Sequence, residues 1–266
     1  MLSTAANYYA DVYQTEFSDP GAGGALGAWI AEKTGGFLQP AEAELSIPEE
    51  TVMALVNTLW YRVQWAKQFQ ASETAPADFT TEDGETVSWD FMHWTDDDGL
   101  CVKGGGYTKA SLGLSKGIMY IVLPDEGTTV DSLLTEEKLW DIFENEPRAS
   151  REIRWSVPKF ETNAVYELED SLKSLGISSA FDREQADFSR ISDAPLVLNQ
   201  VRQGTHIAVN EDGVEAAAYT FEGMVASAWG SEPTVVEMNL NRPFIYLITA
   251  DDGSPLFLGV VRNPSK

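Results

Sequence analysis

The sequence is poor in basic residues, holds two histidines and has a single cysteine. Its 266 residues include 18 Lys and Arg against 42 Asp and Glu, which gives a formal net charge of -24. A surface this acidic repels phosphate backbones and anionic lipids, so nucleic acid and membrane surfaces are not expected as partners. The lone Cys101 excludes an intramolecular disulfide framework, and we expect it to be a small buried apolar residue. No apolar run is long enough for a membrane-spanning helix.

Residues that carry enzyme chemistry are also scarce. The histidines His93 and His206 do not stand at metal-ligand spacing from Cys, Asp or Glu, so we expect no metal site. The triplet Gly104–Gly106 lacks the Lys and helix of a phosphate loop, and no Gly-x-Ser-x-Gly or dinucleotide motif is present. We therefore expect a protein that is not an enzyme and uses no cofactor. An unrelated acidic enzyme stays as an alternative, because a Ser-His-Asp triad can be assembled from distant positions.

Apolar residues make up 43% of the chain, enough for a large core, and the patterns predict one α+β domain over residues 1–266. Three segments have helical spacing. Residues 23–36 end on paired glycines, residues 131–145 begin at an Asp131 cap, and residues 164–177 close at Gly176.

Other segments have the composition of strands. The apolar run 51–61 predicts a strand covered on both faces, with Asn57 buried and hydrogen-bonded. Residues 79–123 predict short strands separated by turns at 97–99 and 104–106, and the first of these turns would keep Asp96, Asp97 and Asp98 in solvent. Further strands are expected at 151–160, at 195–213 and three times at the C-terminus, where Asp251-Asp252-Gly253 forms a hairpin.

Several motifs occur in one order along the chain. They are AWIAEKTGGFL (28–38), VNTLWYRVQWAKQF (56–69), VPKFETNAVYELEDSLKSLGISSAFDREQADFSRIS (157–192), NEDGVEAAAYT (210–220) and NRPFIYLITADDGSPLFLGVVRNP (241–264). Together they resemble the serpin family of serine-protease inhibitors. The resemblance implies large mixed β-sheets with helices packed on them and an exposed reactive loop. It also implies that residues 1–266 are the C-terminal two-thirds of the family fold, without the N-terminal helices and one main-sheet strand.

In the segment NEDGVEAAAYT, the residues that would lie on one face of an extended strand differ in size and charge from those on the other face. In an extended strand one face would carry Val214, Ala216, Ala218 and Thr220, and the other Glu215, Ala217 and Tyr219. The first face is small and nearly apolar, as needed for a strand that slips into an existing sheet, and Gly213 can act as a pivot. An ordinary Ala-rich helix is the alternative. The resemblance makes this segment the loop hinge, formed by Glu211, Gly213, Val214, Glu215, Ala216, Ala217, Ala218 and Thr220.

The same resemblance implies a single-use inhibitor that forms a covalent acyl complex with a target serine protease. The scissile bond is expected at Ser227–Ala228, or alternatively at Trp229–Gly230. No Arg or Lys stands between Gly213 and Asn241, so the loop favours elastase-like or subtilisin-like targets over trypsin-like ones.

The resemblance also has implications for the region where the loop enters the sheet and for functions other than inhibition. Loop entry and sheet opening would involve Asn57, Trp65 and Gln203, the last in place of the family's usual histidine. A non-inhibitory binding or carrier protein and an inactive fragment are the alternatives to an inhibitor. We expect a monomer. The N-terminus has no secretory signal pattern, so an extracellular or cell-surface location is suggested by the resemblance alone.

Overall fold

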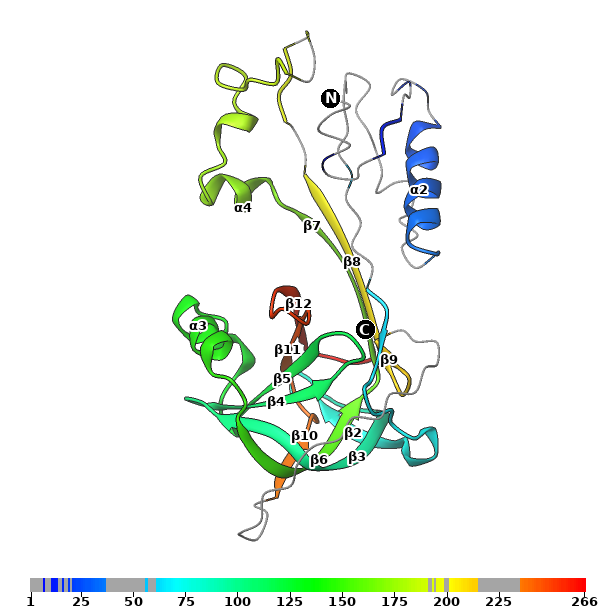
Figure 1. The fold of residues 1–266 in the computed structure, drawn as a ribbon, viewed down its shortest axis with the longest axis vertical. Helices are drawn as coiled ribbons and strands as arrows, with labels where there is room; N and C mark the ends of the chain where they lie inside the picture. The colour runs from blue at the N-terminus through cyan, green and yellow to red at the C-terminus, as the bar shows by residue number, and fades with distance from the viewer. Residues whose placement is uncertain are drawn as a thin grey trace. The chain divides into compact units, whose positions relative to one another are not determined.

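The computed structural model describes residues 7, 11–13, 16, 19, 21–36, 56, 61–190, 193, 195–198, 201–214 and 235–266 (Figure 1). The chain divides into two compact units, one of Met1–Trp60 with Asn163–His206 and one of Tyr61–Thr162 with Ile207–Lys266. The expected single domain over 1–266 stays a prediction. The predictions for Asn57, Glu215, Ala216, Ala217, Ala218, Thr220, Ser227, Ala228, Trp229 and Gly230 lie outside the described residues.

The first unit contains helix α2 (Ala22–Lys33), which buries Ile30 and ends as predicted at Gly35 and Gly36, both with positive φ. The predicted helix over 164–177 is wrong in its first half. Strand β7 (Phe160–Glu167) runs through Val165, and only α4 (Glu169–Ser174) is helical, before the 3₁₀ turn η4 (Ser179–Phe181). Pairing of β7 in a sheet overrides the helical spacing. Gly176 does close α4, with φ 92°.

A large sheet is the main feature of the second unit. Its strand order is β10-β6-β3-β4-β5-β11-β12, and β2 pairs with β3 outside this path. The strands are β2 (Ala75–Thr80), β3 (Thr86–Lys103), β4 (Tyr107–Gly113), β5 (Ile118–Pro124), β6 (Ala149–Pro158), β10 (Val236–Asn239), β11 (Phe244–Thr249) and β12 (Pro255–Val261). The three C-terminal strands and the hairpin at Gly253 are confirmed, as is the burial of Cys101.

The turn predicted at Asp97-Asp98-Gly99 is wrong, because β3 continues through it as one 18-residue strand. The chain absorbs the two aspartates as an irregularity in the β3–β6 register between Asp96 and Gly99. A Cβ at Gly99 would stand 2.6 Å from Ile153 Cδ1, so the glycine permits the close approach of β6. Asp97 and Asp98 are exposed, but Asp96 is half-buried, and burial raises its pKa. The turn at Gly104–Gly106 is confirmed.

The predicted helix at 131–145 is divided and has a different cap. Residues Val130–Leu133 form a 3₁₀ turn (η3), and helix α3 spans Glu136–Glu144. Asp131 does not cap it, because its carboxylate pairs with Arg262 at 2.6 Å. Thr135 takes that place, and its hydroxyl accepts the Lys138 N–H at 3.4 Å. Helix α3 packs over β4 and β5 (Figure 1) through a core of Tyr107, Val122, Val130, Leu133, Ile142 and Ile245.

A smaller sheet has the strand order β1-β9-β8-β7. Its other members are β1 (Val63–Gln64), β8 (Arg202–Asn210) and β9 (Gly213–Val214). The strand predicted at 51–61 falls almost wholly outside the described residues. Of its two described members, Val56 is 36% exposed and Tyr61 is partly buried, contrary to the expected burial on both faces.

Candidate functional site

The candidate site is the short strand β9, which stands between two other strands. Val214 pairs with Val63 of β1 on one side and with Val209 of β8 on the other. Both pairings are antiparallel, and Gly213 is held between Gln64 and Asn210 in the same way. The Val214 side chain is fully buried, with 0% exposed. Strand β9 therefore has the position of a central strand, although it is only two residues long.

Gly213 is required by the close approach of these strands. Its φ of 150° lies in a region that side chains disfavour. A Cβ at this position would stand 2.4 Å from the Val63 carbonyl oxygen and 2.6 Å from Gln64 Cα. Both contacts are backbone atoms of the neighbouring strand, so no rotamer change could relieve them.

A tight turn delivers the chain from β8 into β9. The Asp212 N–H donates to the Asn210 side-chain oxygen at 3.0 Å, which closes an Asx turn. Trp65 contacts both residues: its indole N–H donates to the Asn210 carbonyl at 2.8 Å, and its backbone N–H donates to the Asp212 carbonyl at 3.3 Å. The indole is buried and meets Phe69 edge to face at 5.6 Å. Trp65 thereby fixes the turn against the core.

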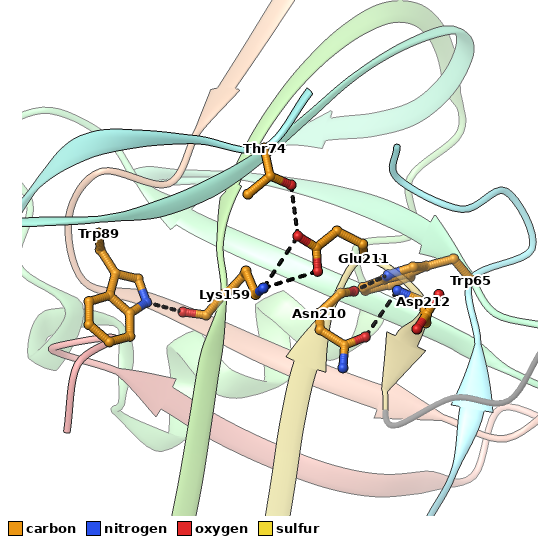
Figure 2. Close-up of polar contacts among 7 residues, drawn as sticks. All are labelled: Trp65, Thr74, Trp89, Lys159, Asn210, Glu211 and Asp212. Atoms are coloured by element: carbon orange, nitrogen blue, oxygen red, sulfur yellow. Dashed lines mark hydrogen bonds and ion pairs between the residues drawn. The ribbon is translucent and has the colours of Figure 1, made fainter. Parts of the chain in front are cut away.

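Glu211 anchors the same turn from the other side (Figure 2). The Thr74 hydroxyl donates to Glu211 Oε1 at 2.8 Å, and Lys159 Nζ lies 3.2 Å from Oε2 and 3.3 Å from Oε1. Burial raises the pKa of Glu211, but its backbone N–H, Thr74 and Lys159 together outweigh burial. The pKa of this carboxyl therefore lies below its ordinary value of 4.5.

The backbone of Lys159 is itself held in place. The Trp89 indole N–H donates to the Lys159 carbonyl at 2.6 Å, and the Lys159 N–H donates to the Asp90 carbonyl at 2.9 Å (Figure 2). The ammonium that meets Glu211 thus projects from a fixed point between β6 and β7. Its side chain is 36% exposed, so water screens the ion pair partly.

Four of the residues singled out in the sequence come together here, namely Trp65, Glu211, Gly213 and Val214. Gln203 does not join them, because it lies partly buried in the portion of β8 that belongs to the other unit. Sequence reasoning missed Thr74 and Lys159. Lys159 lies within the quoted VPKF motif, whereas nothing in the sequence distinguishes Thr74.

No group of three or more His, Cys, Asp or Glu side chains that could hold a metal ion occurs among the described residues. Within the same residues, no helix has the length and apolarity needed to cross a membrane. At β9 the chain is paired with a strand on each side and makes a close backbone contact at Gly213, so the arrangement holds the start of segment 213–214 in the sheet.

Comparison with known proteins identifies the fold family. The family model "Serpin (serine protease inhibitor)" matches residues 2–264. The chain is a serpin. It is 30% identical over 246 residues to mouse (Mus musculus) Serpin B11, covering 90% of this chain and 63% of the relative. It is 32% identical over 255 residues to wheat (Triticum aestivum) Serpin-Z1B, covering 90% of this chain and 63% of the relative.

A solved structure agrees with this assignment. Thyroxine-binding globulin in complex with thyroxine superposes with a TM-score of 0.78 at 26% identity, covering 100% of this serpin and 71% of that chain. The predicted α+β serpin fold is therefore confirmed. This serpin spans about 63% of the length of the two curated relatives. The family model is that of serine protease inhibitors, and the globulin among the structural neighbours is a complex with thyroxine.

Proposed function

We propose that this serpin inhibits a serine endopeptidase once per molecule, by inserting its reactive loop as a strand between β1 and β8. In this proposal the protease cleaves the loop and becomes joined to it as an acyl-enzyme. Insertion then displaces the protease before the acyl bond hydrolyses. The serpin is the consumed partner in this reaction and performs no catalysis.

One observation carries the proposal: β9 already pairs with a strand on each side and buries Val214 completely. A loop that continued from Val214 in the same register would place Ala216, Ala218 and Thr220 on the buried face. These side chains are small, so they can enter between two strands with little rearrangement. The charged Glu215 would lie on the opposite face, in contact with water.

Insertion of the loop would release a free energy that is large compared with the cost of distorting the trapped protease. A strand of about ten residues gains roughly ten hydrogen bonds, each worth about 1 kcal/mol net, so the total is on the order of 10 kcal/mol. Distorting the oxyanion hole of a trapped protease costs several kcal/mol of transition-state stabilisation. The energy of insertion therefore exceeds what is needed to stop deacylation.

The proposed target class follows from the residues around the expected scissile bond. Met224, Val225, Ala226 and Ser227 are small or unbranched at Cγ and carry no charge. Such residues fit the shallow apolar pockets of elastase-like and subtilisin-like proteases. A trypsin-like protease has an acidic pocket that selects Arg or Lys, and neither residue occurs between Gly213 and Asn241.

The test is a mixing experiment with the purified protein. Elastase or subtilisin should give a denaturant-resistant conjugate at close to one-to-one stoichiometry, and trypsin should not. Mass spectrometry of the released C-terminal peptide then locates the bond. A peptide that begins outside 225–232 would overturn the bond assignment, and cleavage of the loop without any conjugate would overturn the inhibitory function.

A carrier function is the second candidate, and similarity to thyroxine-binding globulin at 26% identity favours it. A carrier needs no loop insertion, so cleavage between residues 215 and 234 would leave its stability unchanged. An inhibitor of the proposed kind gains stability on cleavage, because the freed loop enters the sheet. Thermal unfolding before and after cleavage distinguishes the two functions.

A further inference from the structure

Lys109 is a buried lysine in the middle of β4. Only 1% of the residue is exposed, whereas a lysine is almost never fully buried unless it is paired. In the large sheet it lies opposite Val122 of β5 and Val102 of β3, which are both apolar. An ammonium in such surroundings loses its hydration, and only contacts within the protein can offset that cost. The contacts that Lys109 makes therefore decide how well its charge is tolerated.

One contact joins Lys109 to the C-terminal end of helix α3, which lies over β4 and β5 (Figure 1). The ammonium Nζ donates to the Ile142 carbonyl at 2.8 Å. Ile142 is among the last four residues of α3, and the last four carbonyls of an α-helix have no partner within the helix. The last turn of α3 has no basic residue of its own, although a cation there would complement the helix dipole. Lys109 therefore supplies this cation from the sheet.

Two further groups interact with the ammonium. Nζ lies 4.5 Å from the centre of the Tyr120 ring in β5, which is a cation–π distance. Glu146, just beyond α3, attracts the ammonium through its carboxylate, which also accepts a long hydrogen bond of 3.5 Å from the Tyr120 hydroxyl. Burial nevertheless lowers the pKa of Lys109 from its ordinary value of 10.5, and the attraction of Glu146 offsets only part of this effect. The closed structure therefore binds the lysine's proton more weakly than water-exposed lysine does.

A second set of contacts joins the same end of α3 to β4. The Tyr107 hydroxyl donates to Asp141 Oδ2 at 2.9 Å and accepts from the Asn145 side-chain amide at 3.3 Å. Neither bond involves the lysine. The C-terminal turn of α3 is thus attached to the sheet at two points, and the attachment through Lys109 is the one that buries a cation.

We propose that Lys109 is a proton-sensitive latch on the C-terminal turn of α3: the turn opens more readily while the lysine is protonated and is held more tightly once the lysine is neutral. In the closed turn the ammonium is cut off from water. When the turn opens, water solvates the ammonium and the cost of burial disappears. Opening therefore favours proton binding, and by linkage proton binding favours opening. The latch does not depend on insertion of the reactive loop.

Opening of the turn becomes harder as the pH rises toward 10.5. The pKa of Lys109 is lowered in the closed turn and returns to its ordinary value of 10.5 in the open one. Between these two pKa values the closed turn has lost the proton that the open turn still binds, so the free energy of opening increases with pH. At lower pH both forms are protonated and opening is easiest. Above 10.5 both are neutral and the free energy of opening reaches its maximum.

The experiment measures hydrogen exchange of the amides of residues 142–145 in the regime where exchange reports the opening equilibrium. The result is expressed as a protection factor, so that the intrinsic effect of pH on exchange cancels. The original protein is compared with Lys109→Met, whose apolar side chain of similar length cannot titrate. Between about pH 7 and about pH 10 we expect protection in the original protein to rise by about threefold or more, and protection in Lys109→Met to change by less than about 1.5-fold.

Two control variants separate Lys109 from the other titrating groups. Lys138→Met is the matched control, because Lys138 also donates from α3 to a backbone carbonyl, that of Gly105 at 3.1 Å, but is only partly buried. Tyr120→Phe keeps the ring beneath the ammonium and removes the phenol. Both variants should keep the rise in protection.

A protection factor that stays constant with pH in the original protein would overturn the latch, and this measurement needs no variant to fold. An equal rise in Lys109→Met would overturn it as well. Loss of the rise in Tyr120→Phe or in Lys138→Met would also overturn it, because the phenol or the other lysine would then be the titrating group.

Discussion

Gly213→Ala is the substitution that most directly probes the seating of β9. The new Cβ would stand 2.4 Å from the Val63 carbonyl oxygen and 2.6 Å from Gln64 Cα, well inside van der Waals contact. Because both atoms belong to a paired backbone, either β1 shifts or β9 leaves its place. Release of β9 exposes Val214, whose burial is worth about 1.5–3 kcal/mol, and breaks hydrogen bonds worth about 1 kcal/mol each.

The matched control is Gly127→Ala. Gly127 also has positive φ, at 82°, but a Cβ there meets no atom within 4 Å. Both variants place a side chain at a positive φ, which costs about 1–3 kcal/mol of backbone strain, so Gly127→Ala controls for the greater part of that strain but lacks the contact with β1. We expect Gly213→Ala to lose about 2–4 kcal/mol more than Gly127→Ala in denaturant unfolding, or to exchange the Val214 N–H far faster. Equal stability and equal exchange in the two variants would refute the claim that β9 is seated between β1 and β8.

Two further substitutions test the anchor and the corrected helix cap. Glu211→Gln should cost about 1 kcal/mol at pH 7. The pKa of Glu211 is lowered from 4.5, so the carboxylate's contribution is present above pH 4.5 and lost as the pH falls below it. The difference in unfolding free energy between variant and original should therefore shrink as the pH falls below 4.5, and a difference that does not change with pH would contradict the ion-pair account. Thr135→Ala should cost about 1 kcal/mol and speed exchange of the Lys138 N–H, which Asp131→Ala should leave unchanged. Faster exchange in the Asp131 variant would restore Asp131 as the cap.

The sequence predicted best those elements whose local pattern agrees with their final environment. The strands β11 and β12, their hairpin at Gly253 and helix α2 with its glycine stop were found from apolar runs and turn residues alone. The strands β11 and β12 pair with each other through this hairpin, and the second partner of β11, strand β5, accepts the same apolar pattern. Local preference and tertiary structure therefore agree.

The errors arose where contacts distant in sequence decide the outcome. Asp97 and Asp98 have the composition of a turn, but pairing of β3 with β6 carries the strand through them. Asp131 has the chemistry of a cap, but Arg262, 131 residues away, takes its carboxylate. No periodicity can reveal such partners, because they are brought together only by the fold.

Only part of the candidate site could be predicted from the sequence. The hinge residues Glu211, Gly213 and Val214 were singled out by pattern and resemblance, and the structure brings Trp65 against the same turn. The partners of Glu211 are Thr74, which directly follows the 3₁₀ turn Ala71–Glu73, and Lys159, which lies between β6 and β7. The Thr74 hydroxyl is important only because the fold brings it within 2.8 Å of Glu211 Oε1, and the composition of the sequence cannot predict such a contact.

The central claim, that the loop inserts as a strand in the register begun by β9, is tested most directly by three aspartate variants. In that register Ala216 and Ala218 turn toward the core and Ala217 turns toward water. A buried aspartate without a partner costs at least several kcal/mol, a large part of the insertion energy of about 10 kcal/mol. The measurement is the fraction of serpin found as conjugate or as cleaved product with elastase. Ala216→Asp and Ala218→Asp should yield mostly cleaved product, whereas Ala217→Asp should yield mostly conjugate. Equal yields from all three variants would contradict insertion in this register.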